Sequence, residues 1–176
     1  MRITIGGTPA SGKGTAGKLL AKELGYEYWS AGSVWRVEAQ KHGMTLNEFH
    51  RYLTDHPQFD HYLDEKQAEL SERDDIIVDS RLGFHFVKGS VKIYLMTNID
   101  VAAARLYAAK RNEEQVTSVA EARAEIEERM HAERTRHKEL YGVDIADTHN
   151  YDIVIDTTPL DPKAVVDAIM VQLPYS

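Results

Sequence analysis

The segment Gly7-Thr8-Pro9-Ala10-Ser11-Gly12-Lys13-Gly14-Thr15 constrains the fold of this chain more than any other feature. It lies between a short β-branched run, Arg2–Ile5, and a segment whose apolar residues recur at helical spacing up to Leu24. Its glycines allow backbone angles closed to other residues, so that consecutive N–H groups can converge on phosphate oxygens at a helix N-terminus. Lys13 supplies a mobile positive charge for the terminal phosphates. The pattern predicts a strand, a phosphate-binding loop and a helix; the alternative is a glycine-rich turn that only links the two elements.

Four further segments have the length and composition of strands. They are 26–30, 76–79, 91–96 and 153–156, and most are continuous apolar runs, typical of strands covered on both faces. The first strand is expected to stop at Gly6-Gly7. Five strands alternating with helices in 176 residues predict an α/β fold, a doubly wound five-stranded parallel sheet built as one domain.

Two segments of this domain are polar, rich in helix signals and inserted between strands. Thr45–Glu48 and Ser118–Glu121 have the spacing of capping boxes, and Pro57 separates the first helix from a second over 59–73. The other helices are expected at 12–24, 101–111, 119–141 and from Asp161-Pro162 onward. We interpret 38–73 as an insertion that binds the acceptor and 112–142 as a lid, because polar excursions of this kind often cover a ligand.

The composition excludes several classes of function. Lys and Arg number 21 against 28 Asp and Glu, a formal charge of -7, which argues against a general surface for nucleic acid or anionic membrane. Phosphate binding must therefore be local. Cysteine is absent, which excludes disulfides, thiolate metal sites and cysteine nucleophiles. The chain has no apolar run typical of a signal or a membrane span, so a cytoplasmic protein is expected.

Asp79 and Arg81 lie at the end of the third strand, where ligands bind in open α/β sheets. Asp79 is placed to orient the water ligands of magnesium, with the Thr15 hydroxyl on the same side. Arg81 is a candidate clamp for an acceptor phosphate, since a planar guanidinium gives two parallel bonds to phosphate. In the alternative interpretation, Asp79 caps the following turn and Arg81 pairs with it.

Arg129, Glu133 and Arg136 share one face of the long helix, at positions i, i+4 and i+7. Two cations on a closing segment would neutralise charge on a transferring phosphoryl group. The alternative is a solvated face laced with salt bridges, because the helix is charged all round. For Arg105 and Arg111 the same two interpretations apply, a phosphate contact or a solvated ion pair, and Arg111 is a candidate contact at the lid hinge.

Asp64 and Gln67 lie three residues apart on an inserted helix and could place a carboxylate and an amide toward an acceptor base. Ordinary polar surface positions are the alternative. The eight histidines form no ligand pattern with acidic residues, so the only metal expected is the magnesium carried by a nucleotide.

Several blocks of the chain resemble nucleoside monophosphate kinases. In Gly12-Lys13-Gly14-Thr15 the hydroxyl comes one place later than usual, an ending similar to adenylate and cytidylate kinases. Segments 78–82, 136–144 and 151–157 resemble the short cytidylate kinases of archaeal type, and the resemblance spans nearly the whole chain. It implies a sheet order of 2-3-1-4-5, Mg²⁺ and ATP as cofactors, CMP or dCMP as acceptor, direct in-line transfer, and a monomer that binds small nucleotides.

The resemblance also implies roles for particular residues. The turn after the second strand, with Ser33, ends in Arg36, which matches the family's arginine for the acceptor phosphate; a surface helix residue with an ordinary ion pair is the alternative. Arg129, Glu133 and Arg136 match the arginine–acid–arginine spacing of the cytidylate kinase lid. Lys13 and Asp79 complete the expected catalytic set.

Two other functions remain open on the sequence. An adenylate kinase, or another small-molecule kinase, would share the loop and the arginines and differ in the acceptor pocket. An ATP-dependent switch or assembly factor would have no obvious use for so many arginines beyond the loop. For a cytidylate kinase, a carboxylate paired with a donor would select cytosine over uracil, and either Asp64 with Gln67 or Glu133 with a neighbouring arginine could provide that pair.

Overall fold

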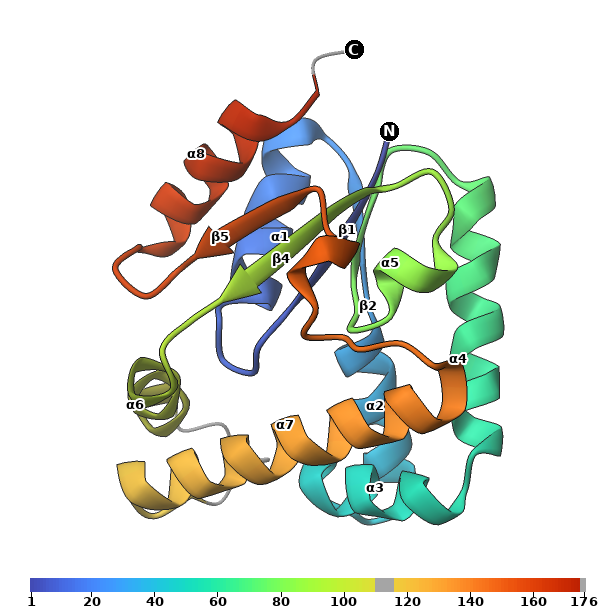
Figure 1. The fold of residues 1–176 in the computed structure, drawn as a ribbon, viewed down its shortest axis with the longest axis vertical. Coiled ribbons are helices and arrows are strands. Elements are labelled where there is room, and N and C mark those ends of the chain that lie inside the picture. The colour runs from blue at the N-terminus through green and yellow to red at the C-terminus, as the bar shows by residue number, and fades with distance from the viewer. Residues whose placement is uncertain (110–115, 175–176) are drawn as a thin grey trace.

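The computed structural model of the chain describes residues 1–109 and 116–174. Arg111 and the first residues of the 112–142 segment lie outside the described residues. Figure 1 shows a sheet wrapped by helices, with both termini at one end and a long helix across the other.

The sheet has five parallel strands in the order β2-β3-β1-β4-β5. The strands are β1 (Arg2–Gly7), β2 (Glu27–Ser30), β3 (Ile76–Asp79), β4 (Val91–Met96) and β5 (Ile153–Asp156). Both the expected fold class and the strand order are confirmed. Asp79 pairs with Ile5 on one side and with Ser30 on the other, so that the polar ends of β2 and β3 lie beside the start of the phosphate-binding loop.

Helices pack on both faces of the sheet. α1 (Lys13–Leu24) and α8 (Pro162–Gln172) lie together and share a core with Ile3 and Ile5 of β1. Thr4, which points the opposite way, meets α5 (Gly83–Phe86), where a Cβ on Gly83 would lie 3.1 Å from the Thr4 Cβ. The alternation of side chains along β1 therefore divides the two layers of helices.

The inserted segments build two smaller cores beyond the carboxyl ends of the strands. α3 (Leu46–Tyr52) and α4 (Gln58–Glu69) of the first segment pack with α2 (Ala31–Lys41), and α7 (Val119–Tyr141) of the second packs with α6 (Ile99–Ala109). Short 3₁₀ helices lie at 53–55, 70–72 and 148–150. Phe49 and Trp35 centre the core of α2, α3 and α4, and Ile126 joins α7 to α6. α7 runs from α6 to α4 across the carboxyl ends of the sheet (Figure 1).

The structure corrects several expected boundaries. Gly6 and Gly7 belong to β1, because Gly7 still pairs with Leu95 and the absence of side chains allows β4 and Tyr151 to approach closely. The segment after β2 is not a turn: helix α2 begins at Ala31, directly after the N-cap Ser30. α5 is a further helix that the sequence analysis missed, and α6 begins two residues earlier than expected, at Ile99.

The two expected capping boxes have different outcomes. Thr45 and Glu48 form both reciprocal bonds. Ser118 caps α7 by accepting from the Glu121 N–H, but the Glu121 carboxylate accepts from Thr117 instead of from Ser118. The second box is therefore displaced by one residue. None of the described helices is both long enough and apolar enough to cross a membrane.

Replacing Gly7 tests the close approach of β1 to β4. Its φ is +138° and an added Cβ would lie 1.9 Å from the Leu95 carbonyl oxygen, so we expect Gly7→Ala to lower the free energy of unfolding by about 2–5 kcal/mol. Gly14→Ala is the control, because its Cβ would meet only ordinary contacts at 3.6 Å. Urea denaturation of the two variants checks this; equal midpoints would contradict the close approach of β1 to β4.

Candidate active site

The phosphate-binding loop is anchored to the ends of two neighbouring strands. The Thr8 hydroxyl accepts from the Thr97 N–H at 3.2 Å, and the Thr157 hydroxyl donates to the Ser11 carbonyl at 3.0 Å. Gly12, with φ at 88°, is the N-cap of α1, a left-handed conformation that glycine adopts without strain. The loop is therefore held by β4 and β5 while its residues lead into the N-terminus of a helix, the geometry that binds anions.

Lys13 folds back over this loop. Its Nζ donates to the carbonyl oxygens of Thr8 at 2.6 Å and Gly7 at 3.1 Å. Burial, together with the positive charge of Arg81, holds the pKa of Lys13 well below its usual value. A phosphate would supply the counter-charge that these neutral carbonyls lack.

Asp79 lies opposite the loop and is oriented by an aromatic hydroxyl. Tyr28 on β2 donates to Asp79 Oδ2 at 2.8 Å, and burial next to this carboxylate raises the pKa of Tyr28. A Cβ on Gly14 would lie 3.6 Å from both of these oxygens, and one on Gly17 would lie 2.7 Å from the Tyr28 ring. The two glycines of α1 therefore leave space for the Tyr28–Asp79 pair beside the loop.

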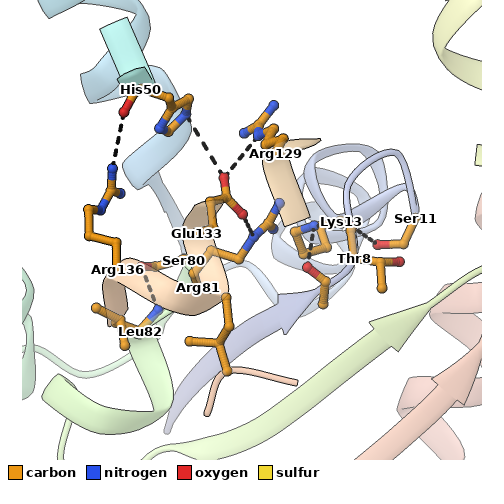
Figure 2. A network of polar contacts seen from close by, with 12 residues as sticks. Thr8, Ser11, Lys13, His50, Ser80, Arg81, Leu82, Arg129, Glu133 and Arg136 are labelled. Atoms are coloured by element: carbon orange, nitrogen blue, oxygen red, sulfur yellow. Dashed lines mark hydrogen bonds and ion pairs between the residues drawn. The ribbon is translucent and has the colours of Figure 1, made fainter. Parts of the chain in front are cut away.

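Glu133 is the centre of the polar network in Figure 2. Its side chain is 5% exposed, and the carboxylate accepts from Arg81 Nε at 2.7 Å and from Arg129 Nε at 2.9 Å. Burial alone would raise the pKa of Glu133, but the two arginines hold it well below its usual value. This is a buried ion cluster, so the alternative of a solvated face is wrong at Glu133. The pairing of Arg81 with Asp79 is replaced by its bond to Glu133.

Arg136, one helical turn further on, faces the inserted helices. It donates to the His50 carbonyl at 3.4 Å and lies 3.7 Å from the Asp60 carboxylate. His50 also places its Nε2 at 4.0 Å from Glu133, and burial with Arg129 nearby lowers the pKa of His50 to about 3. The imidazole is therefore neutral at physiological pH.

Asp64 and Gln67 both reach the site, and each has a partner. Tyr141 of α7 donates to Asp64 Oδ2 at 2.5 Å, and burial raises the pKa of Asp64 to about 6. The Ser80 hydroxyl donates to the buried amide oxygen of Gln67. These contacts join α4 to α7 and to the end of β3.

Arg36 and Arg105 have different surroundings. Arg36 belongs to α2, which begins with the small residues Ala31, Gly32 and Ser33. The Arg36 guanidinium lies beside Gly32, where an added Cβ would be 3.6 Å from Arg36 Nη1. Arg105 donates to the carbonyl of Thr157 at 2.8 Å and to that of Leu160 at 3.3 Å. Arg105 therefore holds the loop after β5.

One cavity of about 860 Å³ brings these groups together. Among the expected site residues its lining includes Pro9, Ala10, Ser11, Gly12, Lys13, Gly14, Thr15, Ser33, Arg36, Asp64, Gln67, Asp79, Arg81, Arg129, Glu133 and Arg136. Gly7 and Thr8 are not part of the lining, but their carbonyl oxygens accept hydrogen bonds from Lys13. The sequence analysis missed Tyr28, His50, Asp60, Ser80 and His137, which also line the cavity. Only Ser80 and Tyr28 carried a signal, since they lie near strand ends.

The cytidylate kinase-like family model matches residues 2–159. The chain belongs to this family. It is 36% identical over 172 residues to a cytidylate kinase of Archaeoglobus fulgidus, which covers 97% of this chain and 93% of that protein. The suspected resemblance to cytidylate kinases is confirmed.

A second relative is a longer protein. The chain is 35% identical over 171 residues to an S-adenosylmethionine-dependent nucleotide dehydratase of Lacinutrix mariniflava, covering 96% of this chain but only 35% of that protein. Among solved structures, a shikimate kinase from Bacteroides thetaiotaomicron matches with a TM-score of 0.64 at 16% identity, over 97% of this chain and 95% of that one. This last likeness shows the fold alone.

The Glu133 cluster generates a stability prediction. We expect Glu133→Gln to lower the free energy of unfolding by about 3 kcal/mol without nucleotide, because two partly buried arginines lose their buried counter-charge. Glu128→Gln, an exposed position on the same helix, should leave the unfolding midpoint unchanged.

The same cluster predicts a pH dependence. Because the pKa of folded Glu133 lies below its usual 4.5, its contribution is present above that pH and is lost as the pH falls through the lower folded value. Urea titrations of wild type and Glu133→Gln across this range check both points. A difference between the two proteins that is as large in strong acid as at neutral pH would contradict the ionised cluster.

Proposed function

We propose that the chain transfers the terminal phosphoryl group of ATP to CMP or dCMP. The observation that carries the proposal is the convergence of Lys13, Arg81 and Arg129 on one cavity, with a single buried carboxylate, Glu133, between the two arginines. Cations at this density suit a ligand that brings several phosphates. Family membership supports the same reaction class.

The donor would bind at the loop. The N-terminus of α1 would receive the phosphates of ATP, and Lys13 would exchange its two carbonyl partners for phosphate oxygens. The residues present fit a magnesium ion carried by the nucleotide, since Asp79 and Thr15 line the cavity and both offer oxygen atoms, the ligands that magnesium prefers. When bound, that ion would neutralise charge on the phosphate oxygens.

The acceptor would bind on the other side of Arg81. An oxygen of its phosphate would attack the terminal phosphorus of ATP, the bond to the bridging oxygen would break, and ADP would leave. Arg36 and Arg81 would orient the acceptor phosphate, while Lys13 and Arg129 would stabilise charge on the transferring group. No covalent enzyme intermediate is needed.

The two inserted segments, 38–73 and 112–142, would act as the acceptor insertion and the lid. They meet through bonds from α7 to both inserted helices, Arg136 to His50 at 3.4 Å and Tyr141 to Asp64 at 2.5 Å. With these bonds formed, the two segments would exclude water from bound phosphates.

Base preference decides between the proposal and its nearest alternative. We expect CMP and dCMP to give the highest kcat/KM in a coupled assay of ADP release across all monophosphates, exceeding UMP by roughly 10- to 100-fold. An AMP maximum would make the chain an adenylate kinase. If no monophosphate accelerates ADP release above slow hydrolysis, the switch or assembly factor replaces the kinase.

Lys13 tests the donor side. We expect Lys13→Ala to lower kcat by at least roughly 100-fold, because the transferring phosphate loses its mobile counter-charge. The melting temperature should not fall, since Lys13 is buried among neutral carbonyls that hold its charge poorly. Lys22→Ala, an exposed lysine on the same helix, is the control. Full turnover in a folded Lys13→Ala protein would contradict the loop assignment.

A further inference from the structure

Unpartnered buried polar atoms gather at one end of the cavity. Within residues 1–109 and 116–174, buried side-chain nitrogens or oxygens without a hydrogen-bond partner are found on Arg2, His50, Asp60, Arg136 and His137. All of these residues except Arg2 line the cavity. Buried polar atoms are normally paired, so a cluster of unpaired ones facing one cavity indicates a polar ligand that pairs them.

The other acidic groups described near this end already have partners. Glu133 accepts from Arg81 and Arg129, and Asp64 accepts from Tyr141. Asp60 differs, because its side chain is 5% exposed and its Oδ2 has no partner among the described residues. An ionised carboxylate oxygen left unpaired at this depth is costly, and burial accordingly raises the pKa of Asp60.

Asp60 and Arg136 are held side by side. Asp60 Oδ1 lies 3.7 Å from Arg136 Nη2, and Arg136 Nη1 is fixed by the His50 carbonyl at 3.4 Å. Asp60 Oδ2 and Arg136 Nε, the two atoms that remain unpaired, offer one acceptor and one donor. In Figure 2, Arg136 and His50 lie at one end of the network and Lys13 at the other, with Glu133 and Arg81 between them. This acceptor–donor pair is therefore separated from the phosphate loop by the arginine cluster.

We propose that Asp60 and Arg136 are the pair that recognises the base of the acceptor nucleotide, with Asp60 as the specificity-determining residue. The inference rests on the proposed function. Cytosine offers a 4-amino donor next to the N3 acceptor, so its amino group donates to Asp60 Oδ2 while N3 accepts from the Arg136 guanidinium. The pair thus takes the place of the alternatives from the sequence, in which Asp64 already accepts a bond from Tyr141, Gln67 from Ser80 and Glu133 from two arginines. In this assignment Arg136 serves the base in place of the transferring phosphoryl group.

Uracil reverses this pattern. Its 4-carbonyl would face the carboxylate oxygen and its N3–H would face the guanidinium, which puts like poles together at both positions. Adenine presents an amino group beside a ring acceptor as cytosine does, so the pair discriminates cytosine from uracil and leaves the rejection of purines to the size of the pocket.

The test compares Asp60→Asn with Asp64→Asn, its neighbour one turn along α4. Asparagine has nearly the shape of aspartate and can donate to the uracil carbonyl. We expect Asp60→Asn to lower the ratio of kcat/KM for CMP over UMP by roughly 10- to 100-fold. The KM for CMP should rise, while the KM for ATP stays unchanged. Asp64→Asn should preserve the CMP/UMP ratio.

A second substrate isolates the amino group. The monophosphate of pyrimidin-2-one ribonucleoside lacks the 4-amino group of CMP but keeps N3 and the 2-carbonyl. Wild type should use it roughly 10-fold or more less well than CMP, and Asp60→Asn should show a much smaller difference. If Asp60→Asn does not fold, Arg136→Lys provides the same comparison, because it keeps the charge and loses the planar donor edge.

The outcomes separate this inference from the proposed function. A wild type that uses CMP no better than the other monophosphates overturns the proposed function. A wild type that prefers CMP, together with an Asp60→Asn variant that keeps the CMP/UMP ratio or loses activity equally on both, overturns the role of Asp60 alone. Loss of the ratio in Asp64→Asn instead would move base recognition to Asp64.

Discussion

The buried carboxylate of Glu133 holds the active-site end of this molecule together. Arg81 comes from the end of β3 and Arg129 from α7, and neither guanidinium could lie so close to the other in a partly desolvated cavity without a shared counter-charge. Glu133 provides it on the same helix as Arg129. The position of α7 across the sheet therefore depends on two kinds of interaction. The ion pairs of Glu133 connect it to the end of β3, and the apolar packing of Ile126 connects it to α6.

This arrangement explains how a cavity lined by several cations persists in a protein of formal charge -7. The cations are local, and each already has a partner: Lys13 has carbonyls of its own loop, while Arg81 and Arg129 share one carboxylate. Arriving phosphates bring more negative charge than Glu133 does. The arginines are thus already gathered at one cavity, and the exchange of the Lys13 partners is the rearrangement expected when phosphates bind.

The sequence predicted the parts of the fold that local patterns determine. The strands follow from mostly apolar runs, and the loop follows from glycines and a lysine between a strand and a helix, so the fold class was correct. The strand order came from the resemblance to cytidylate kinases, because no local pattern determines it. Helix α2 was missed because it begins in small residues, Ala31 and Gly32, and is stabilised by burial of Trp35 against α3. The cavity residues His50 and Asp60 were missed for a related reason: their neighbour Arg136 is on a distant helix, and no spacing within one element brings such residues together.

The charged residues of α7 contact different parts of the cavity. Arg129 and Glu133 pair with each other near the middle of the network in Figure 2, while Arg136, three residues after Glu133, contacts His50 and Asp60 of the inserted helices. A single rigid helix therefore contributes to both ends of the cavity. A displacement of Arg136 at one end of the cavity would also displace Arg129 at the other, because the helix cannot bend sharply without a proline or a comparable break. Occupation of the base end would then favour the geometry needed at the phosphates, which is how binding energy from a remote part of a substrate is used at the reacting centre.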